Sequence, residues 1–209
     1  MRVVLGLERL LASDRLHNKR IGVVCNQASV DHDFQSATDL LATRSRGNLR
    51  AIFSPQHGFR SDVQENMIES PHGRDDVREI PVYSLYSETR QPTTAMLRDI
   101  DLLVVDLQDV GTRIYTYIYT MALCLKSAAK QALEVVVCDR PNPIGGDAVD
   151  GPMLEKGFES FVGLYPIPMR HGMTIGELAR LFNEEFDIGA KLEVVPMDGW
   201  RRDMYFDAT

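Results

Sequence analysis

Short runs of β-branched and other apolar residues alternate with helical stretches along most of the chain. The apolar runs predict strands at 20–26, 49–54, 81–87, 101–107, 133–138 and 191–196. The stretches between them predict helices at 36–43, 92–99, 115–131 and 174–186. Strands that are apolar throughout and alternate with helices are typical of a parallel sheet covered on both faces. The pattern therefore predicts an α/β fold with a doubly wound, mostly parallel sheet.

Local signals refine the ends of this pattern. Thr174 can cap the last predicted helix, because Glu177 follows three residues later and completes a capping box. The stretch 140–170 is rich in proline and glycine and predicts irregular structure. Residues 199–209 contain no evident turn, helix or cap, so we expect the chain to be a fragment of a longer protein.

Composition excludes several classes of protein. The net charge is -7 with no cluster of Lys or Arg, which argues against nucleic acid as a partner. No apolar run approaches the roughly 20 residues of a membrane span. Glu8 and Arg9 interrupt the apolar N-terminus, so no signal peptide is predicted. We expect a cytoplasmic protein, or a periplasmic or secreted one if a leader has been removed.

Neither a cofactor nor a metal is predicted. Glycine-rich phosphate loops and the Gly-x-Ser-x-Gly motif of serine hydrolases are both missing from the sequence. The three cysteines have no metal-ligand spacing, so we expect small buried thiols at Cys25, Cys124 and Cys138.

Polar side chains gather where the predicted strands end. In open parallel sheets, ligands bind beside the carboxyl ends of the strands. Five strand ends carry such groups: Asn26; Gln56 and His57; Glu88; Asp106, Asp109 and Arg113; Asp139, Arg140 and Asn142. If the strands are parallel, these groups converge at one edge of the sheet, although His57 is equally well an ordinary loop histidine.

Some of these groups also have a structural interpretation. Asp106 lies within an apolar strand and needs a partner, since an unpaired buried charge is costly, and Arg113 is one candidate. Asp139 and Arg140 are consistent with a simple ion pair that holds the loop. Asn142 lies between two prolines and is consistent with a turn.

Two further groups allow more than one interpretation. Tyr115, Tyr117 and Tyr119 resemble a platform for a sugar ring, but this spacing spreads them around a helix, so at least one should pack in the core. Arg170 and His171 precede the last predicted helix, where a side chain either contacts a ligand or closes a loop.

Several long motifs occur in a fixed order: SPQHGF, PVYSLY, DLQDVGTRIYTYIYTM, DRPNPIGG, SFVG and RHGMTIGELA. In this respect the chain resembles the DUF1343 family, which includes NamZ-like exo-β-N-acetylmuramidases. The resemblance runs from about Gly6 to Trp200. It implies a Rossmann-like catalytic domain, here 1–200, with 201–209 beginning a linker or a truncated second domain. The implied substrate is a muramyl sugar at the non-reducing end of a peptidoglycan fragment, and the implied partner is the missing C-terminal domain.

One position departs from the family motif. The segment Pro55–Gly58 commonly reads Pro-Glu-His-Gly in the family, and here its second residue is Gln56. Glycosidases usually need a carboxylic acid to protonate the leaving oxygen, which glutamine cannot supply. Another carboxyl group then takes the role, with Glu65 favoured and Asp109 the other main candidate. Alternatively, the acetamido group of the substrate acts as nucleophile and Gln56 orients it, or the chain binds the sugar without cleaving it.

The resemblance also implies roles for the remaining polar groups. Arg113, Arg140 and Arg170 are candidates to grip the lactyl carboxylate of muramic acid. His57, Asn142 and His171 are candidates to hydrogen-bond sugar hydroxyls or the acetamido group. The predicted set of substrate-binding residues is completed by Asn26, Tyr115 and Asp139.

Three rivals to the glycosidase stay open. A non-catalytic domain that binds muramyl sugars is favoured by Gln56 and by the absence of a second domain. A structural or interaction domain would use the same face to pack on its missing half. A metal-dependent hydrolase is the most distant rival, because His57, Asp106 and Asp109 lack ligand spacing.

Overall fold

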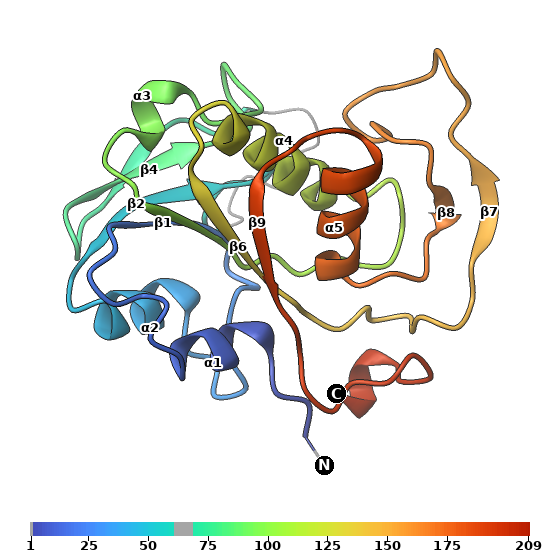
Figure 1. Ribbon diagram of the computed structural model, residues 1–209, viewed down its shortest axis with the longest axis horizontal. Helices are drawn as coiled ribbons and strands as arrows, with labels where there is room; N and C mark the ends of the chain where they lie inside the picture. Colours follow the sequence, from blue (N-terminus) through green and yellow to red (C-terminus); the bar gives the residue numbers. More distant parts are fainter. Residues whose placement is uncertain (1, 61–68) are drawn as a thin grey trace.

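The computed structural model describes residues 2–60 and 69–209. A seven-stranded sheet forms its centre, in the order β3-β4-β2-β1-β5-β6-β9 (Figure 1). All neighbouring strands pair in parallel except β3, which pairs antiparallel with β4. The strands are β1 (Ile21–Val24), β2 (Leu49–Ser54), β3 (Gly73–Asp75), β4 (Ile80–Ser84), β5 (Leu102–Val105), β6 (Glu134–Cys138) and β9 (Lys191–Val195).

Helices cover both faces of this sheet, as Figure 1 shows. One face packs against α1 (Gly6–Leu11) and α2 (Ala37–Arg44). The other packs against α3 (Thr94–Leu97), α4 (Tyr117–Ala129) and α5 (Ile175–Glu185). The predicted α/β fold with a mostly parallel sheet is therefore confirmed.

The central strands are apolar throughout because each side of the sheet has its own core. Val104 packs in the core beneath α1 and α2, whereas Val105 packs in the core beneath α4 and α5. Val136 and Val137 divide in the same way. Successive side chains of a strand point to opposite faces, so both must be apolar when both faces are covered.

The predicted strands and helices are all present; β2 has the predicted bounds, α2 is shifted by one residue, and the others are shorter. Thr174 caps α5 as expected: its hydroxyl accepts from the backbone N–H of Glu177, and the Glu177 carboxylate accepts from the N–H of Thr174. All three cysteines are buried. No helix among the described residues is long and apolar enough to cross a membrane.

Some elements were missed or wrongly expected. The sequence did not predict α1 or β3, and the stretch 140–170 contains an antiparallel pair, β7 (Asp150–Met153) and β8 (Pro168–Arg170). The expectation that 199–209 lacks any turn or helix is wrong, because a 3₁₀ helix, η1, spans Phe206–Ala208. This end packs on the unit described above: the N–H of Phe206 donates to the Pro143 carbonyl and that of Gly146 to the Arg202 carbonyl. The predicted domain boundary at residue 200 stays a prediction.

Candidate active site

Several pockets lie where the carboxyl ends of the strands meet, among them one of about 460 Å³ that Gln27, Gln108 and Arg140 line. Two others adjoin the SPQHGFR motif. The larger has a volume of about 820 Å³, which is within the range of small-molecule sites. We call it the tyrosine pocket; it is lined by Gln56, His57, Tyr86, Arg90, Ile114, Tyr115, Thr116, Tyr117, Ser160, Phe161 and Val162. These residues follow β2 and β4, lead into α4, and come from the long connection between β7 and β8.

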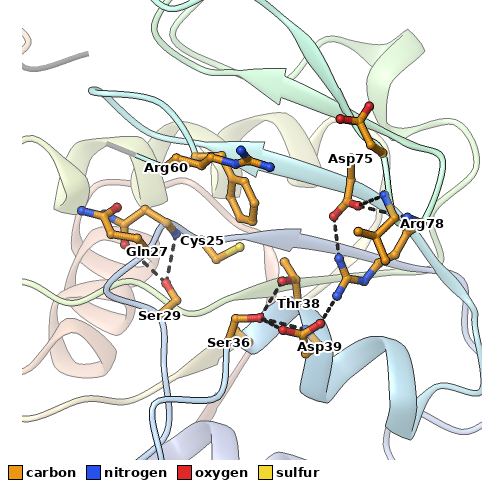
Figure 2. Close-up of a pocket in the computed structure, with 14 residues that line it drawn as sticks. Cys25, Gln27, Ser29, Ser36, Thr38, Asp39, Arg60, Asp75 and Arg78 are labelled. Carbon is orange, nitrogen blue, oxygen red and sulfur yellow. Dashed lines mark hydrogen bonds and ion pairs between the residues drawn. The ribbon is translucent and has the colours of Figure 1, made fainter. Parts of the chain in front are cut away.

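The second pocket, of about 410 Å³, lies between the end of β1, the start of α2 and the β3–β4 turn (Figure 2). We call it the α2 pocket. Three of its charged groups pair with one another, because Arg78 forms ion pairs with both Asp39 and Asp75. Arg60 and Asp76 also line the pocket. Burial alone would raise the pKa of Asp75, but hydrogen bonds from Arg78 lower it. Asp39, Asp75 and Arg78 are thus satisfied within the chain.

The SPQHGFR motif separates the two pockets. Gln56 and His57 line the tyrosine pocket, whereas Phe59 and Arg60 line the α2 pocket. His57 has a φ of 75° and Gly58 a φ of 79°, and the N–H of Gly58 donates to the Pro55 carbonyl. A left-handed conformation is uncommon for a residue other than glycine, and such strain concentrates at functional sites. This turn places His57 on the wall of the pocket.

Gln56 is held by two side chains at the start of α4. Its amide oxygen accepts a hydrogen bond from the Thr116 hydroxyl at 3.0 Å, and its backbone carbonyl accepts from the Tyr117 hydroxyl at 3.4 Å. Tyr117 in turn accepts from the Asn26 amide at 2.9 Å. The amide nitrogen of Gln56 is therefore the end of the side chain that can donate to a ligand. Asn26 is buried and supports Tyr117 from behind.

The three tyrosines divide between the pocket and the core. The rings of Tyr115 and Tyr117 lie 4.5 Å apart and both line the tyrosine pocket. Tyr119 is fully buried near Tyr165 and Phe182, and its hydroxyl donates to the Arg113 carbonyl. The expectation that at least one packs in the core is confirmed. Burial raises the pKa of Tyr115, so its hydroxyl stays protonated.

Two of the three arginines proposed for the lactyl carboxylate have buried internal partners. Arg140 forms a bidentate ion pair with Asp106, with both nitrogen–oxygen distances 2.7 Å, and also donates to the Val30 carbonyl. Arg113 donates to the carbonyls of Pro152 and Ile167. The alternative in which Arg113 neutralises Asp106 is therefore wrong. These contacts favour structural roles for both arginines.

The third of these arginines, Arg170, is half-buried and donates to the Ile144 carbonyl. Its backbone forms a bridge with Thr112. It does not line either of the two pockets. The position of Arg170 therefore does not favour its predicted role of binding the lactyl carboxylate of muramic acid.

Asp139 and Asn142 also bond to their own chain. Asp139 accepts from the Gly176 N–H at 2.8 Å and from the Thr174 hydroxyl at 3.0 Å, which holds the start of α5 against the sheet. Burial raises the pKa of Asp139. Arg140 donates to Asp139 through its backbone N–H, while its guanidinium pairs with Asp106, so the predicted simple ion pair between the Asp139 and Arg140 side chains is wrong. Asn142 accepts from the Ile144 N–H and donates to the Met173 carbonyl, as the turn interpretation predicts.

Asp109 and His171 form a buried pair behind the pocket. Both are 2% exposed, and the His171 Nε2 and Asp109 Oδ2 atoms lie 3.2 Å apart, outside hydrogen-bond geometry. The N–H of Met173 donates to Nδ1 of His171, which assigns the proton of the neutral ring to Nε2, facing Asp109. Neither residue lines the tyrosine pocket or the α2 pocket.

None of the described residues that line the tyrosine pocket carries a carboxyl group. The predicted acid Glu65 lies outside the described residues. Across the described part of the chain, no group of three or more His, Cys, Asp or Glu could hold a metal ion.

Sequence reasoning missed seven residues that line the tyrosine pocket: Tyr86, Arg90, Ile114, Thr116, Ser160, Phe161 and Val162. Tyr86 and Arg90 follow β4, so they lie at the same edge as the groups that were recognised. The predicted group after this strand was Glu88, and Arg90 lies two residues further along the chain. Phe161 enters from the connection between β7 and β8, whose position no local pattern indicates.

The fold and the pocket define a Rossmann-like α/β domain with a cavity of small-molecule size at the carboxyl ends of its strands. Residues 21–209 match the family described as exo-beta-N-acetylmuramidase NamZ, N-terminal, and the chain belongs to this family.

Relatives of known sequence and structure agree with this family. The chain is 49% identical over 210 residues to the peptidoglycan beta-N-acetylmuramidase NamZ of Bacillus subtilis (strain 168), covering 100% of this chain and 50% of that protein. Two crystal structures of DUF1343 family proteins from Bacteroides fragilis NCTC 9343 are similar. One has a TM-score of 0.90 at 41% identity, and the other 0.84 at 33%. They match 99% of this chain and 53% and 55% of theirs. The chain thus spans about half the length of these relatives.

Proposed function

We propose that the protein is an exo-β-N-acetylmuramidase that removes N-acetylmuramic acid from the non-reducing end of peptidoglycan fragments. The observation that carries this proposal is the 49% identity, over the whole chain, to a Bacillus subtilis protein named for that activity. The tyrosine pocket supports it, because a volume of about 820 Å³ accommodates a monosaccharide with part of its leaving group.

The walls of the tyrosine pocket suit a sugar. The partly exposed rings of Tyr115 and Phe161 offer apolar faces for the C–H surface of a pyranose. Tyr86 and Tyr117 are 5% and 3% exposed and pack beside them. Gln56 and His57 add polar groups beside these rings. In this arrangement Gln56 orients the acetamido group through its amide nitrogen, consistent with the bond that its amide oxygen accepts from Thr116.

Hydrolysis requires a proton donor to the leaving oxygen and a group that attacks the anomeric carbon or activates water. We assign the acid to Glu65, which is five residues after Arg60, the last residue of the SPQHGFR motif. Asp109 is less suited, because it is 2% exposed and does not line the pocket. A further domain, in the part of the relatives that this chain does not span, would complete the cleft.

The test is release of N-acetylmuramic acid from a chromogenic muramide, with the matching glucosaminide as the comparison substrate and the protein at its natural length. We expect release from the muramide alone. Glu65→Gln should lower kcat by about 10²- to 10⁴-fold, the usual contribution of general acid catalysis. Glu184→Gln, which changes an exposed residue of α5, should leave the rate unchanged.

Two results would contradict this account. Full turnover by Glu65→Gln would remove Glu65 as the acid. Binding of the muramide without any release would instead identify a sugar-binding domain, the second candidate, which Gln56 and the lack of a carboxyl group among the described lining residues favour.

A further inference from the structure

Arg90 occupies the tyrosine pocket in an arrangement that the other arginines discussed above do not share. Its guanidinium carbon lies 3.8 Å from the centroid of the Tyr86 ring and 5.7 Å from that of Phe161. These two rings are 5.7 Å apart and tilted by 38°. A guanidinium stacked on aromatic rings keeps its planar edge available for hydrogen bonds, while cation–π attraction fixes its position.

The bonds that Arg90 makes within the chain orient it without neutralising it. One terminal nitrogen donates to the Ser87 carbonyl at 2.7 Å, which fixes the direction of the side chain. The other lies 3.8 Å from a carboxylate oxygen of Glu69, beyond hydrogen-bond distance, and Glu69 is 58% exposed. The Arg90 side chain itself is 34% exposed. An incoming carboxylate can therefore replace this weak, solvated contact.

The charge of the pocket points the same way. Among its described lining residues, Arg90 is the one arginine or lysine, and none is Asp or Glu. Arg140, in contrast, is 4% exposed and bound to Asp106, while Arg113 is 8% exposed and bound to two carbonyls. An anionic group that entered this pocket would meet Arg90 rather than either of these.

We propose that Arg90 binds the lactyl carboxylate of N-acetylmuramic acid and thereby selects muramides over glucosaminides. The proposal rests on the proposed function, because the two sugars differ only by the lactyl ether on O3. Arginine pairs with a carboxylate through two parallel hydrogen bonds, which fixes the orientation of the ligand as well as its charge. A neutral sugar would lose these bonds, so Arg90 would determine specificity.

The experiment compares binding of N-acetylmuramic acid with binding of its methyl ester, by calorimetry, to the protein at its natural length. The wild type should bind the acid more tightly by about 10- to 100-fold, the range for hydrogen bonds to a charged group. Arg90→Gln should bind both sugars with equal affinity. Arg90→Lys should fall between them, because lysine keeps the charge but cannot form the fork.

The matched control is Arg98→Gln, which removes an exposed arginine at the end of α3 and should keep the full preference for the acid. A preference retained by folded Arg90→Gln would overturn the proposal. If that variant fails to fold, Glu69→Gln decides: removing the competing carboxylate should tighten binding of the acid alone, and unchanged affinity would overturn the assignment. Muramide hydrolysis is measured on the same wild-type preparation, so loss of the proposed function is seen separately from loss of the acid–ester preference.

Discussion

Asp106 and Arg140 illustrate how burial decides what a single residue does in this protein. Their side chains are 0% and 5% exposed, and burial alone would lower the pKa of Arg140, but the Asp106 carboxylate raises it. The pair joins the end of β5 to the segment after β6, and Arg140 also reaches the Val30 carbonyl. Each charge is satisfied by the other, so both are committed to the fold.

Removing one partner of this pair should therefore cost stability. Arg140→Met leaves the Asp106 carboxylate buried and unpaired, and we expect a loss of about 3–5 kcal/mol in the free energy of unfolding, measured with urea. Asp106→Asn combined with Arg140→Met should recover part of that loss, because no unpaired charge then remains. A single variant as stable as the wild type would show that the pair does not hold the sheet together.

At the scale of elements, the neighbouring strands β1 and β5 are joined where they begin. Arg20 precedes β1 and Asp101 precedes β5, and the Asp101 carboxylate accepts from the backbone N–H and two guanidinium nitrogens of Arg20 at 2.8–3.0 Å. These hydrogen bonds lower the pKa of Asp101 to about 2. The contact therefore joins the amino ends of these two strands, whereas the tyrosine pocket lies at the carboxyl ends of the strands.

This contact predicts a pH-dependent contribution to stability. Because the pKa of Asp101 is lower in the folded protein than in the unfolded chain, the stabilisation is present above about pH 4 and is lost as the pH falls toward 2. Asp101→Asn keeps the acceptor oxygen and removes the charge. The difference in unfolding free energy between the two proteins should therefore narrow in acid; a difference independent of pH would contradict this assignment. The effect is small, since Asp101 is 36% exposed and screened by solvent.

The elements that could be predicted are those whose pattern follows from burial on two faces. The central strands carry uninterrupted apolar runs and α5 has a capping box, so both can be recognised from the local sequence. In contrast, β7 is exposed along its length and β3 contains only Gly73, Arg74 and Asp75. These strands form because a neighbouring strand pairs with them, which no local pattern records.

The sequence predicted that the candidate site lies at the carboxyl ends of the strands, but it did not predict which side chains pair with one another. Parallel strands do bring Gln56 and His57 to the same edge as the segment before α4. Sequence could not show that Asp106 pairs with Arg140 rather than Arg113, because that choice depends on which loops fold back over the sheet. Nor could the sequence show that Arg90 lies beside Phe161, because the two residues are distant in the chain.

For the whole molecule, the order of strands explains where ligands can bind. β1 lies at the centre of the sheet, between β2 and β5. The connection after β1 leads to β2 on one side, and the connection after β5 leads to β6 on the other side. The two pockets open there, on either side of the SPQHGFR motif. In the α2 pocket Arg78 is paired with Asp39 and Asp75, whereas the tyrosine pocket combines aromatic rings with the Arg90 guanidinium.

The central claim is that the tyrosine pocket holds the muramyl sugar, and the most direct measurement is a crystal structure of the protein soaked with N-acetylmuramic acid. The account predicts electron density for the sugar ring against Tyr115, with the lactyl carboxylate at Arg90. Density for the sugar in the α2 pocket, beside Arg60 and Arg78, with the tyrosine pocket empty, would contradict it.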